Sequence, residues 1–452
     1  MKLRFLGATE TVTGSKYLLE SQHKKMLVDC GLFQGFKELR LRNWAHLPFD
    51  VRDLDAVLLT HAHIDHSGYI PLLVKQGFRG KIYCSAATYD LCRILLPDSG
   101  YLQEEEARRA NRYRYSKHDP AEPLYTEKDA RRALEYFVCV DFEKKVQLDH
   151  SFSFKFRRSG HILGSSFIEV SDGKKTLVFS GDLGRPNDAM MVEPEHFEQA
   201  DYLVVESTYG DRLHDRSDPC DLIGEIISTT ARRGGTIVIP AFAVGRTQSL
   251  LYYIHKLKKA GKIPNIPIFL DSPMAINVTK LLSRHNKEHR LSEKICQEVC
   301  SIATYTRTVE ESKMLDHQAM PSVIISASGM ATGGRVLHHL KTYIGDDRNT
   351  ILFTGFQAGG TRGDRILKGE KEIKIHGQMC PVRARIECLS NISAHADYQE
   401  ILDWLGHFKK APKKVFITHG EPLASAALQE KIIEKYGWNV SVPRYLQREI
   451  LD

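Results

Sequence analysis

The chain has 452 residues, 42% of them hydrophobic and 26% charged, an ordinary balance for a globular protein of two or three domains. No run approaches about 18 apolar residues, which excludes a membrane-spanning helix, and the N-terminus lacks the apolar stretch of a secretory signal. The nine cysteines are scattered without a CxxC pair, so we expect reduced thiols and a cytoplasmic protein. The net charge of +7 permits a polyanionic partner but does not establish one.

The first half of the chain alternates strands and helices, which predicts an α/β fold. Helical spacing occurs at about 86–96 and 127–138. Short apolar runs bounded by turn residues predict strands at 2–7, 26–29, 56–60, 81–84, 153–156, 176–179 and 202–205.

Residues 100–135 are dense in charge and predict a helical insertion. Three glutamates at 104–106 precede four arginines within 108–114, a spacing that favours a solvated helix with paired charges. A nucleic-acid contact by the alternating Arg and Tyr residues at 112–115 is the less favoured interpretation, because a charge run alone is weak evidence.

From about 208 to 390 the pattern changes to the βαβ rhythm of a parallel sheet. Strands are expected at 236–239, 266–270, 322–325 and 349–353, and helices near 219–231, 246–260 and 335–342. After this segment, a strand at 415–418 is followed by His419, as in the first half. We therefore expect one domain at 1–207 and 392–452, interrupted by a second at 208–391.

Residues 61–66 read His61-Ala62-His63-Ile64-Asp65-His66 and follow the apolar run 55–60. Histidines two apart on an extended segment point the same way, while Asp65 and His66 can turn toward a second centre. Imidazole and carboxylate together suit a borderline divalent ion such as Zn²⁺. Because only 20 of the 452 residues are histidines, chance clustering in a polar loop is the poorer explanation, and the segment predicts a metal site.

Other potential ligands lie where strands end, the usual place for a site built from loops on a rigid scaffold. They are Asp29, His161, Asp182, Glu206, His395 and His419. Any one alone would more often be a capping or core polar residue. Six in this arrangement, together with residues 61–66, favour a functional site.

The ordered motifs resemble the metallo-β-lactamase superfamily, in particular its β-CASP branch and the bacterial and archaeal relatives of the cleavage and polyadenylation nuclease. The motifs are 61–66 (HAHIDH), 160–161 (GH), 180–182 (SGD), 206–211 (ESTYGD), 393–397 (SAHAD) and 418–421 (THGE). Similar pieces are 13–15 (TGS), 240–246 (PAFAVGR), 270–275 (LDSPMA), 328–334 (SGMATGG) and 355–363 (GFQAGGTRG). The resemblance implies an αββα sandwich with an inserted β-CASP domain, built on a mainly parallel sheet with flanking helices.

The resemblance also implies two Zn²⁺ ions. It assigns His61, His63 and His161 to one ion, and Asp65, His66 and His419 to the other, with Asp182 bridging. Asp29 resembles the carboxylate that steadies ligand histidines.

By the same resemblance, a hydroxide bridging two metals attacks the phosphorus, and Asp65 orients it or accepts its proton. His395 protonates the leaving 3′ oxygen and Glu206 orients His395, leaving a 5′-phosphate and a 3′-hydroxyl. A structural histidine is the alternative for His395.

Phosphate contacts are expected in the second domain. Backbone N–H groups of the Gly-rich segment 328–334 precede a helix, where they can bind phosphate. A tight turn alone explains the glycines equally well. The candidate contacts are Arg246, Ser328, Gly329, Gly333, Gly334 and Arg362.

The favoured function is a zinc-dependent ribonuclease in RNA processing or decay. It acts on single-stranded RNA, and endonuclease action is favoured over exonuclease action. RNA rather than DNA rests on His419, because DNA-repair relatives tend to carry an apolar residue there. The alternatives are a small-molecule (thio)ester or lactam hydrolase on the same scaffold, and a non-catalytic RNA-binding subunit. No membrane partner is expected, and a homodimer is left open.

Overall fold

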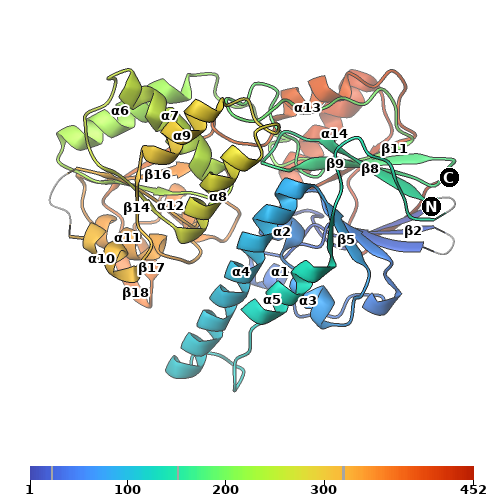
Figure 1. Ribbon diagram of the computed structural model, residues 1–452, viewed down its shortest axis with the longest axis horizontal. Helices are drawn as coiled ribbons and strands as arrows, with labels where there is room; N and C mark the ends of the chain where they lie inside the picture. The colour runs from blue at the N-terminus through green and yellow to red at the C-terminus, as the bar shows by residue number, and fades with distance from the viewer. Residues whose placement is uncertain (22–23, 150–151, 318–320) are drawn as a thin grey trace. The chain divides into compact units, whose positions relative to one another are not determined.

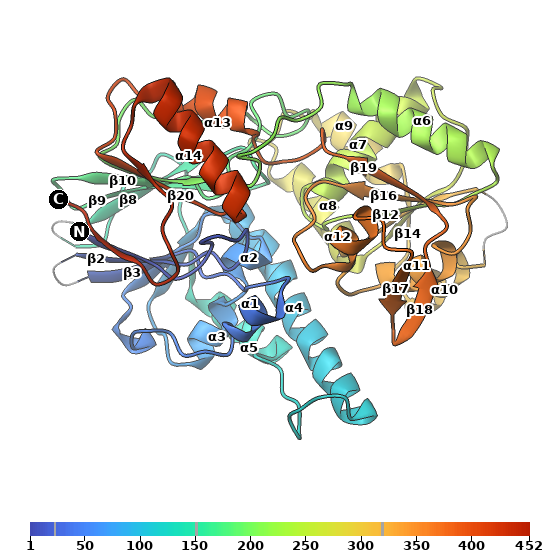
Figure 2. The ribbon, with the colours of Figure 1, turned by 180° about the vertical axis from the view of Figure 1, so that it is seen from behind.

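The computed structural model describes residues 1–21, 24–149, 152–317 and 321–452, which form two compact units (Figures 1 and 2). The first unit comprises Met1–Leu213 and His395–Asp452, and the second comprises His214–Ala394. His395 therefore belongs to the first unit. The expected domain limits at 207/208 and 391/392 stay a prediction.

Two seven-stranded sheets form the first unit. One has the order β22-β1-β2-β3-β4-β5-β6, and the other the order β21-β20-β11-β10-β9-β8-β7. Aromatic side chains from both sheets, among them Phe5, Phe156 and Phe416, share one core, so the sheets stack face to face. The strands of the first sheet are β1 Lys2–Phe5, β2 Tyr17–Ser21, β3 Lys24–Val28, β4 Ala56–Leu58, β5 Lys81–Cys84, β6 Phe137–Cys139 and β22 Arg448–Ile450. Those of the second are β7 Val146–Gln147, β8 Ser153–Arg158, β9 Ser166–Ser171, β10 Thr176–Phe179, β11 Tyr202–Glu206, β20 Lys414–Thr418 and β21 Val440–Ser441.

Helices cover the outer faces of both sheets, which confirms the αββα sandwich (Figure 2). On the second sheet, Val205 and Ile417 pack against Ile401 and Leu428 of the covering helices. These helices are α13 Tyr398–Leu405 and α14 Pro422–Tyr436. The first sheet is accompanied by α1 Lys37–Leu41, α2 Ile64–Ser67, α3 Ile70–Lys75, α4 Ala86–Tyr113 and α5 Glu127–Ala133, with short 3₁₀ turns at Val51–Asp53 and Leu134–Tyr136.

Two helix predictions in the first unit were wrong in extent. The helix expected at 86–96 continues through Pro97 to Tyr113, because packing of its buried face offsets the loss of one backbone hydrogen bond at proline. The helix expected at 127–138 ends at Ala133, because 137–139 pair in parallel with β5. Residues 100–135 comprise the second half of α4, a return segment and α5, and the interpretation of this stretch as an insertion stays a prediction.

A six-stranded sheet of order β14-β13-β15-β12-β16-β19 forms the centre of the second unit, and all its described pairs are parallel, as predicted. Its strands are β12 Ile237–Pro240, β13 Ile268–Asp271, β14 Thr304–Tyr305, β15 Val323–Ser326, β16 Thr350–Thr354 and β19 Arg385–Leu389. Alternate residues of β12 enter different cores, Ile237 and Ile239 one and Val238 the other, so both faces of the sheet are covered.

The helices of the second unit divide between these two cores. The first core receives α6 Pro219–Arg232, α7 Arg246–Lys259, α8 Pro273–Arg284 and α9 Glu293–Ser301. The other receives α10 Val309–Leu315, α11 Val336–Tyr343 and α12 Arg362–Leu367, with the hairpin of β17 Glu372–Ile375 and β18 Gln378–Pro381. No helix in the described part of the chain has both the length and the apolar character needed to cross a membrane.

Candidate metal centre

Strand order brings the predicted ligands of the first unit together. Strands β10, β11 and β20 are parallel neighbours, so Asp182, Glu206 and His419 emerge at one edge of the second sheet. In the first sheet, β3 and β4 are parallel, and the Asp29 N–H donates to the carbonyl of Leu58 at 2.9 Å. The segment containing His61 follows β4 directly, so the ends of the two sheets supply one site.

Four donor atoms form the first group: His61 Nε2, His63 Nδ1, His161 Nε2 and Asp182 Oδ2. His63 Nδ1 lies 3.1 Å from His61 Nε2 and 3.2 Å from His161 Nε2. Asp182 Oδ2 lies 3.2 Å from His61 Nε2 and 3.3 Å from His161 Nε2. Zinc bound tetrahedrally at about 2.0 Å holds its donors roughly 3.3 Å apart, so these separations fit one zinc ion.

Asp65, His66 and His419 form the second group. His66 Nε2 lies 3.1 Å from His419 Nε2, which lies 3.3 Å from Asp65 Oδ2. The other carboxylate oxygen of Asp182, Oδ1, lies 3.2 Å from His66 Nε2. The two oxygens of Asp182 thus face different donor groups, as a bridging ligand requires.

One carboxylate oxygen of Asp182 lacks a hydrogen-bond donor among the described residues. Its Oδ1 is buried and accepts no hydrogen bond from the residues that the structure describes. Buried carboxylate oxygens in proteins almost always have a partner, and a cation satisfies them as well as a hydrogen-bond donor does. The donor set and this oxygen together fit a pair of divalent ions.

The outer ring nitrogens of two ligand histidines are held by carboxylate-linked hydrogen bonds. The His66 Nδ1–H donates to Asp29 Oδ2 at 2.8 Å, and the Thr60 N–H donates to Asp29 Oδ1 at 2.8 Å. The Thr208 hydroxyl donates to Glu206 Oε2 at 2.5 Å, which leaves it to accept from His419 Nδ1 at 3.1 Å. Both arrangements turn the Nε2 lone pairs toward the centre.

Sequence reasoning missed Thr60 and Thr208. Each stands next to a predicted ligand motif, Thr60 before His61 and Thr208 two residues after Glu206. A hydroxyl at such a position was the available signal. The Thr60 hydroxyl donates to Asp29 and lies 3.0 Å from Nδ1 of the adjacent His61, whereas the Thr208 hydroxyl meets His419, which is distant in the chain.

Burial sets the charge of the first donor group. It lowers the pKa of His61 to about 3 and that of His63 to about 4, and it places the pKa of His161 well below its usual value. These rings are neutral at neutral pH, which is the form that binds metal. Burial opposes ionisation of Asp182, but the nearby His419 and His66 hold its pKa well below the usual range.

His395 lies beside both groups without joining either. Its Nδ1–H donates to the Glu206 carboxylate at 3.0 Å, while its Nε2 lies 3.9 Å from Asp182 Oδ2. The Leu183 N–H, at 2.7 Å, fixes Glu206 in turn. Burial would lower the pKa of His395, but Glu206 and Asp182 outweigh it and raise that pKa, which favours the protonated ring.

The candidate phosphate contacts lie in the second unit. The Gly-rich segment Ser328–Gly334 joins β15 to α11, as expected. The Arg362 guanidinium donates to the carbonyl oxygens of Lys374, Ala331 and Thr332 at 2.9, 3.3 and 3.2 Å. Arg246 begins α7 and is largely buried. These contacts give Arg362 a part in holding the loop, and the phosphate roles stay predictions.

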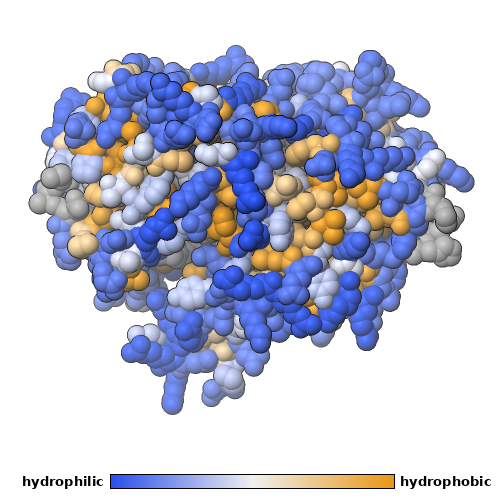
Figure 3. Space-filling model, viewed as in Figure 1, coloured by the Kyte–Doolittle hydropathy of each residue, from blue (hydrophilic) through white to orange (hydrophobic). Residues whose placement is uncertain are grey.

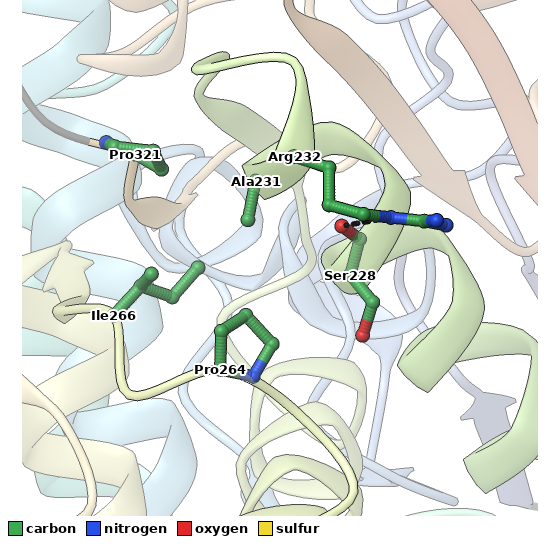
Figure 4. A pocket seen from close by; sticks show the side chains of 6 residues that line it. All are labelled: Ser228, Ala231, Arg232, Pro264, Ile266 and Pro321. Carbon is green, nitrogen blue, oxygen red and sulfur yellow. Dashed lines mark hydrogen bonds between the residues drawn. The ribbon is translucent and has the colours of Figure 1, made fainter.

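A separate hollow in the second unit has a volume of about 320 Å³ (Figure 4). Its lining is mostly apolar and consists of Ser228, Ala231, Arg232, Pro264, Ile266 and Pro321. None of the predicted site residues lines it.

Three family models match successive parts of the chain. Residues 11–224 match the metallo-beta-lactamase superfamily, residues 247–366 the Beta-Casp domain, and residues 379–443 the Zn-dependent metallo-hydrolase RNA specificity domain. A solved structure from Enterococcus faecalis, of a protein of unknown function, covers 99% of both chains with a TM-score of 0.53 at 12% identity. This last similarity concerns the fold alone.

Curated relatives match nearly the full length of this chain. The chain is 35% identical to "Ribonuclease TTHA0252" of Thermus thermophilus, over 98% of this chain and 99% of that protein. It is 31% identical to an "RNase J-like protein" of Methanocaldococcus jannaschii, over 93% and 92% of the two chains. It is 29% identical to "Transcription termination factor FttA" of Methanosarcina mazei, over 96% of this chain and 69% of that protein. The chain belongs to the metallo-β-lactamase superfamily and, within it, to the β-CASP family of metal-dependent RNA hydrolases.

Proposed function

We propose that this protein is a zinc-dependent ribonuclease that hydrolyses RNA phosphodiester bonds and leaves a 5′-phosphate and a 3′-hydroxyl. The observation that carries the proposal is the pair of donor groups sharing Asp182, with the His395–Glu206 pair beside them. The printed names of two full-length relatives, a ribonuclease and an RNase J-like protein, support RNA as the substrate.

His61, His63 and His161 would hold one zinc ion, and Asp65, His66 and His419 the other. Asp182 faces both donor groups and would be a ligand of either ion. Two zinc ions bound there would activate water at neutral pH and neutralise charge on the scissile phosphate. Asp29 keeps the His66 lone pair directed inward through its hydrogen bond to Nδ1.

The proton steps belong to residues of the chain. Asp65 accepts the proton released when water is activated. His395 donates its Nε2 proton to the leaving 3′ oxygen, and Glu206 holds the opposite ring nitrogen so that Nε2 faces the centre. The raised pKa of His395 favours the protonated ring that this step requires.

We further propose endonuclease action on single-stranded RNA in RNA processing or decay. The backbone of Ser328, Gly329, Gly333 and Gly334, with Arg246 and Arg362, contacts phosphates of the substrate. The Gly-rich loop supports this assignment, because it leads into α11 and presents backbone N–H groups.

The test incubates the full-length protein with a 5′-labelled single-stranded RNA and the matching DNA. The zinc-loaded protein, the chelated protein, Asp182→Ala and the matched control Asp141→Ala, an exposed aspartate of the same unit, run in parallel. Zinc-dependent cleavage of RNA that Asp182→Ala loses and Asp141→Ala keeps is the expected result. Internal products, rather than stepwise shortening from one end, identify endonuclease action. Intact RNA from a protein that retains two zinc ions would contradict the proposal and favour a small-molecule hydrolase.

A further inference from the structure

We propose that the projecting end of α4 is a second RNA-binding surface, which contacts single-stranded RNA away from the bond that is cut. The surface, called the α4 arm below, comprises residues 101–118. The choice of RNA as its ligand rests on the proposed function, whereas the basic and aromatic character of the arm does not.

Helix α4 connects the metal centre to this surface. The hydroxyls of Ser85 and Thr88, at the start of the helix, donate to the carbonyl of Gly164 at 2.7 and 2.8 Å, in the loop that carries His161. The helix has 28 residues and therefore extends for about 42 Å. Its far end projects from the rest of the first unit (Figure 1) and is covered by hydrophilic residues (Figure 3).

The arm concentrates positive charge. Three glutamates, at 104–106, lie at the inner end of the α4 arm. Its outer part, residues 107–118, contains no Asp or Glu but five Arg and Lys residues, namely Arg108, Arg109, Arg112, Arg114 and Lys117. Arg108 pairs with Glu105 at 2.5 Å. Within the described ranges of the chain, no carboxylate lies within ion-pair distance of the other four. The sequence predicts a solvated helix with paired charges, but only Arg108 of these five residues has a carboxylate partner among the residues described. The other four positive charges can attract a polyanion.

Aromatic rings accompany the charge. Tyr101, Tyr113 and Tyr115 are 46%, 64% and 54% exposed. At 3.6 residues per turn, Tyr101 and Tyr113 lie on the same side of the helix as Arg109 and Arg112. The opposite side carries Ala107 and Ala110, both buried.

Hydrogen bonds connect the return segment to the arm. Asn111 and Ala121 exchange two hydrogen bonds, at 3.0 and 2.7 Å, and the hydroxyls of Ser99 and Tyr125 lie 2.8 Å apart. A preformed surface loses less conformational entropy when a ligand binds than a flexible one does.

Single-stranded RNA fits both features of the arm. Its phosphates pair with the arginine and lysine residues that have no carboxylate partner in the described chain, and its unstacked bases offer faces to exposed tyrosine rings. The base faces of a duplex are stacked inside it and cannot contact the tyrosine rings. An acidic protein surface would account for the charge of the arm but not for its exposed rings. The arm therefore favours the single-stranded form of the proposed substrate.

The test measures binding by fluorescence anisotropy with full-length Asp182→Asn protein, which leaves the RNA uncut. The probes are an unstructured RNA of about 30 nucleotides, the duplex formed with its complement, and an unstructured RNA of about 6 nucleotides, too short to occupy both sites. The variant Arg109→Gln/Arg112→Gln/Lys117→Gln removes three charges from the arm. Lys144→Gln/Lys174→Gln/Lys410→Gln removes three exposed charges elsewhere in the same unit and is the matched control.

We expect the arm variant to weaken binding of the long RNA about 10-fold or more relative to the control. The slope of log K against log salt concentration should fall by about 2, because each phosphate contact to a single strand contributes roughly 0.7. Tyr101→Leu/Tyr113→Leu should weaken binding on the order of 10-fold without changing the slope.

Equal affinity of the arm variant and the charge-matched control for long RNA would overturn the proposal. So would a loss of affinity that is equal for long and short RNA, or equal for single strand and duplex with no effect of the tyrosine variants. If the native protein binds RNA through the arm but cuts none, the ribonuclease proposal fails and the arm proposal stands.

Discussion

The first and second units each bury a cluster of histidines and carboxylates, and the two clusters are built in opposite ways. In the second unit, Asp271 at the end of β13 accepts from His339 Nε2 and Arg335 Nη1, both at 2.7 Å. The hydroxyl of Ser312 donates to it at 2.6 Å, and His339 Nδ1 donates to Asp316 at 2.8 Å. In the metal centre, by contrast, nitrogen atoms of neighbouring histidines face one another at 3.1 Å.

Protonation follows from this difference. Burial opposes a charge on His339, but Asp271 and Asp316 outweigh it and raise its pKa to about 9, so both ring nitrogens donate. In the first donor group of the metal centre, burial lowers the pKa of His61 to about 3 and leaves its ring neutral, whereas burial of His66 in the second group is outweighed by Asp182 and Asp29, which raise its pKa. A cluster whose donors and acceptors are fully paired is a structural ion network. A cluster whose lone pairs converge, with one carboxylate oxygen left without a donor, fits a metal site.

The largest effect is expected for Asp182→Asn, which removes the carboxylate charge shared by both donor groups. We expect zinc content to fall below two ions and RNA cleavage to fall more than about 10³-fold, because the ions supply several kcal/mol of transition-state stabilisation. Elemental analysis of the purified protein and single-turnover cleavage measure the two quantities. Asp141→Asn is the control, and full zinc content in Asp182→Asn would remove the distinction between the clusters.

His395→Ala should retain both zinc ions and slow cleavage by a factor on the order of 10²–10⁴. The native protein should lose activity as pH rises through the raised pKa of His395, because the ring then has no proton to donate. Glu206→Gln removes the adjacent carboxylate and should move that decline to lower pH. Single-turnover rates of His395→Ala equal to the native rates would refute the acid role.

His339→Ala tests the other cluster, since it removes one of the two cations that contact Asp271 and leaves the partly exposed Asp316 without its histidine. The free energy of unfolding of the second unit should fall by about 1–3 kcal/mol, with zinc content unchanged. Urea denaturation and elemental analysis measure the two. Loss of zinc from a folded His339→Ala protein would show that the clusters are not independent.

The pH dependence of stability sharpens the same point. The pKa of His339 is raised in the folded state, so its contribution to stability is fully present below its ordinary pKa near 6.5 and is lost as pH rises through about 9. The urea midpoint of the native protein should therefore fall between pH 7 and pH 9.5 more steeply than that of His339→Gln. If the urea midpoints of the two proteins changed equally with pH, the charge responsible would not be on His339.

The smallest effect is expected for Thr208→Val, which removes the hydroxyl between Glu206 and His419 but keeps the side-chain volume. Loss of such an outer hydrogen bond typically weakens metal affinity 10–100-fold. Competition with a chromophoric chelator measures this change. An unaltered affinity would show that the orientation of His419 depends on its backbone alone.

The sequence alone determined the metal-ligand candidates of 61–66 and the parallel sheet of the second unit. Both are local signals: a ligand motif directly after an apolar strand, and a βαβ rhythm whose handedness and pairing follow from general rules. The motifs around Glu206 and His419 likewise indicated the family from the sequence alone.

Tertiary structure decided what depends on residues distant in the chain. Strand β5 turned the end of a predicted helix into strand β6, and packing carried α4 through Pro97 to Tyr113. Only the folded chain showed that the oxygens of Asp182 face two donor groups and that His339 pairs with a carboxylate 68 positions away. Local pattern specifies which side chains can do chemistry, whereas the packing of sheets and helices specifies which of them meet and in what protonation state.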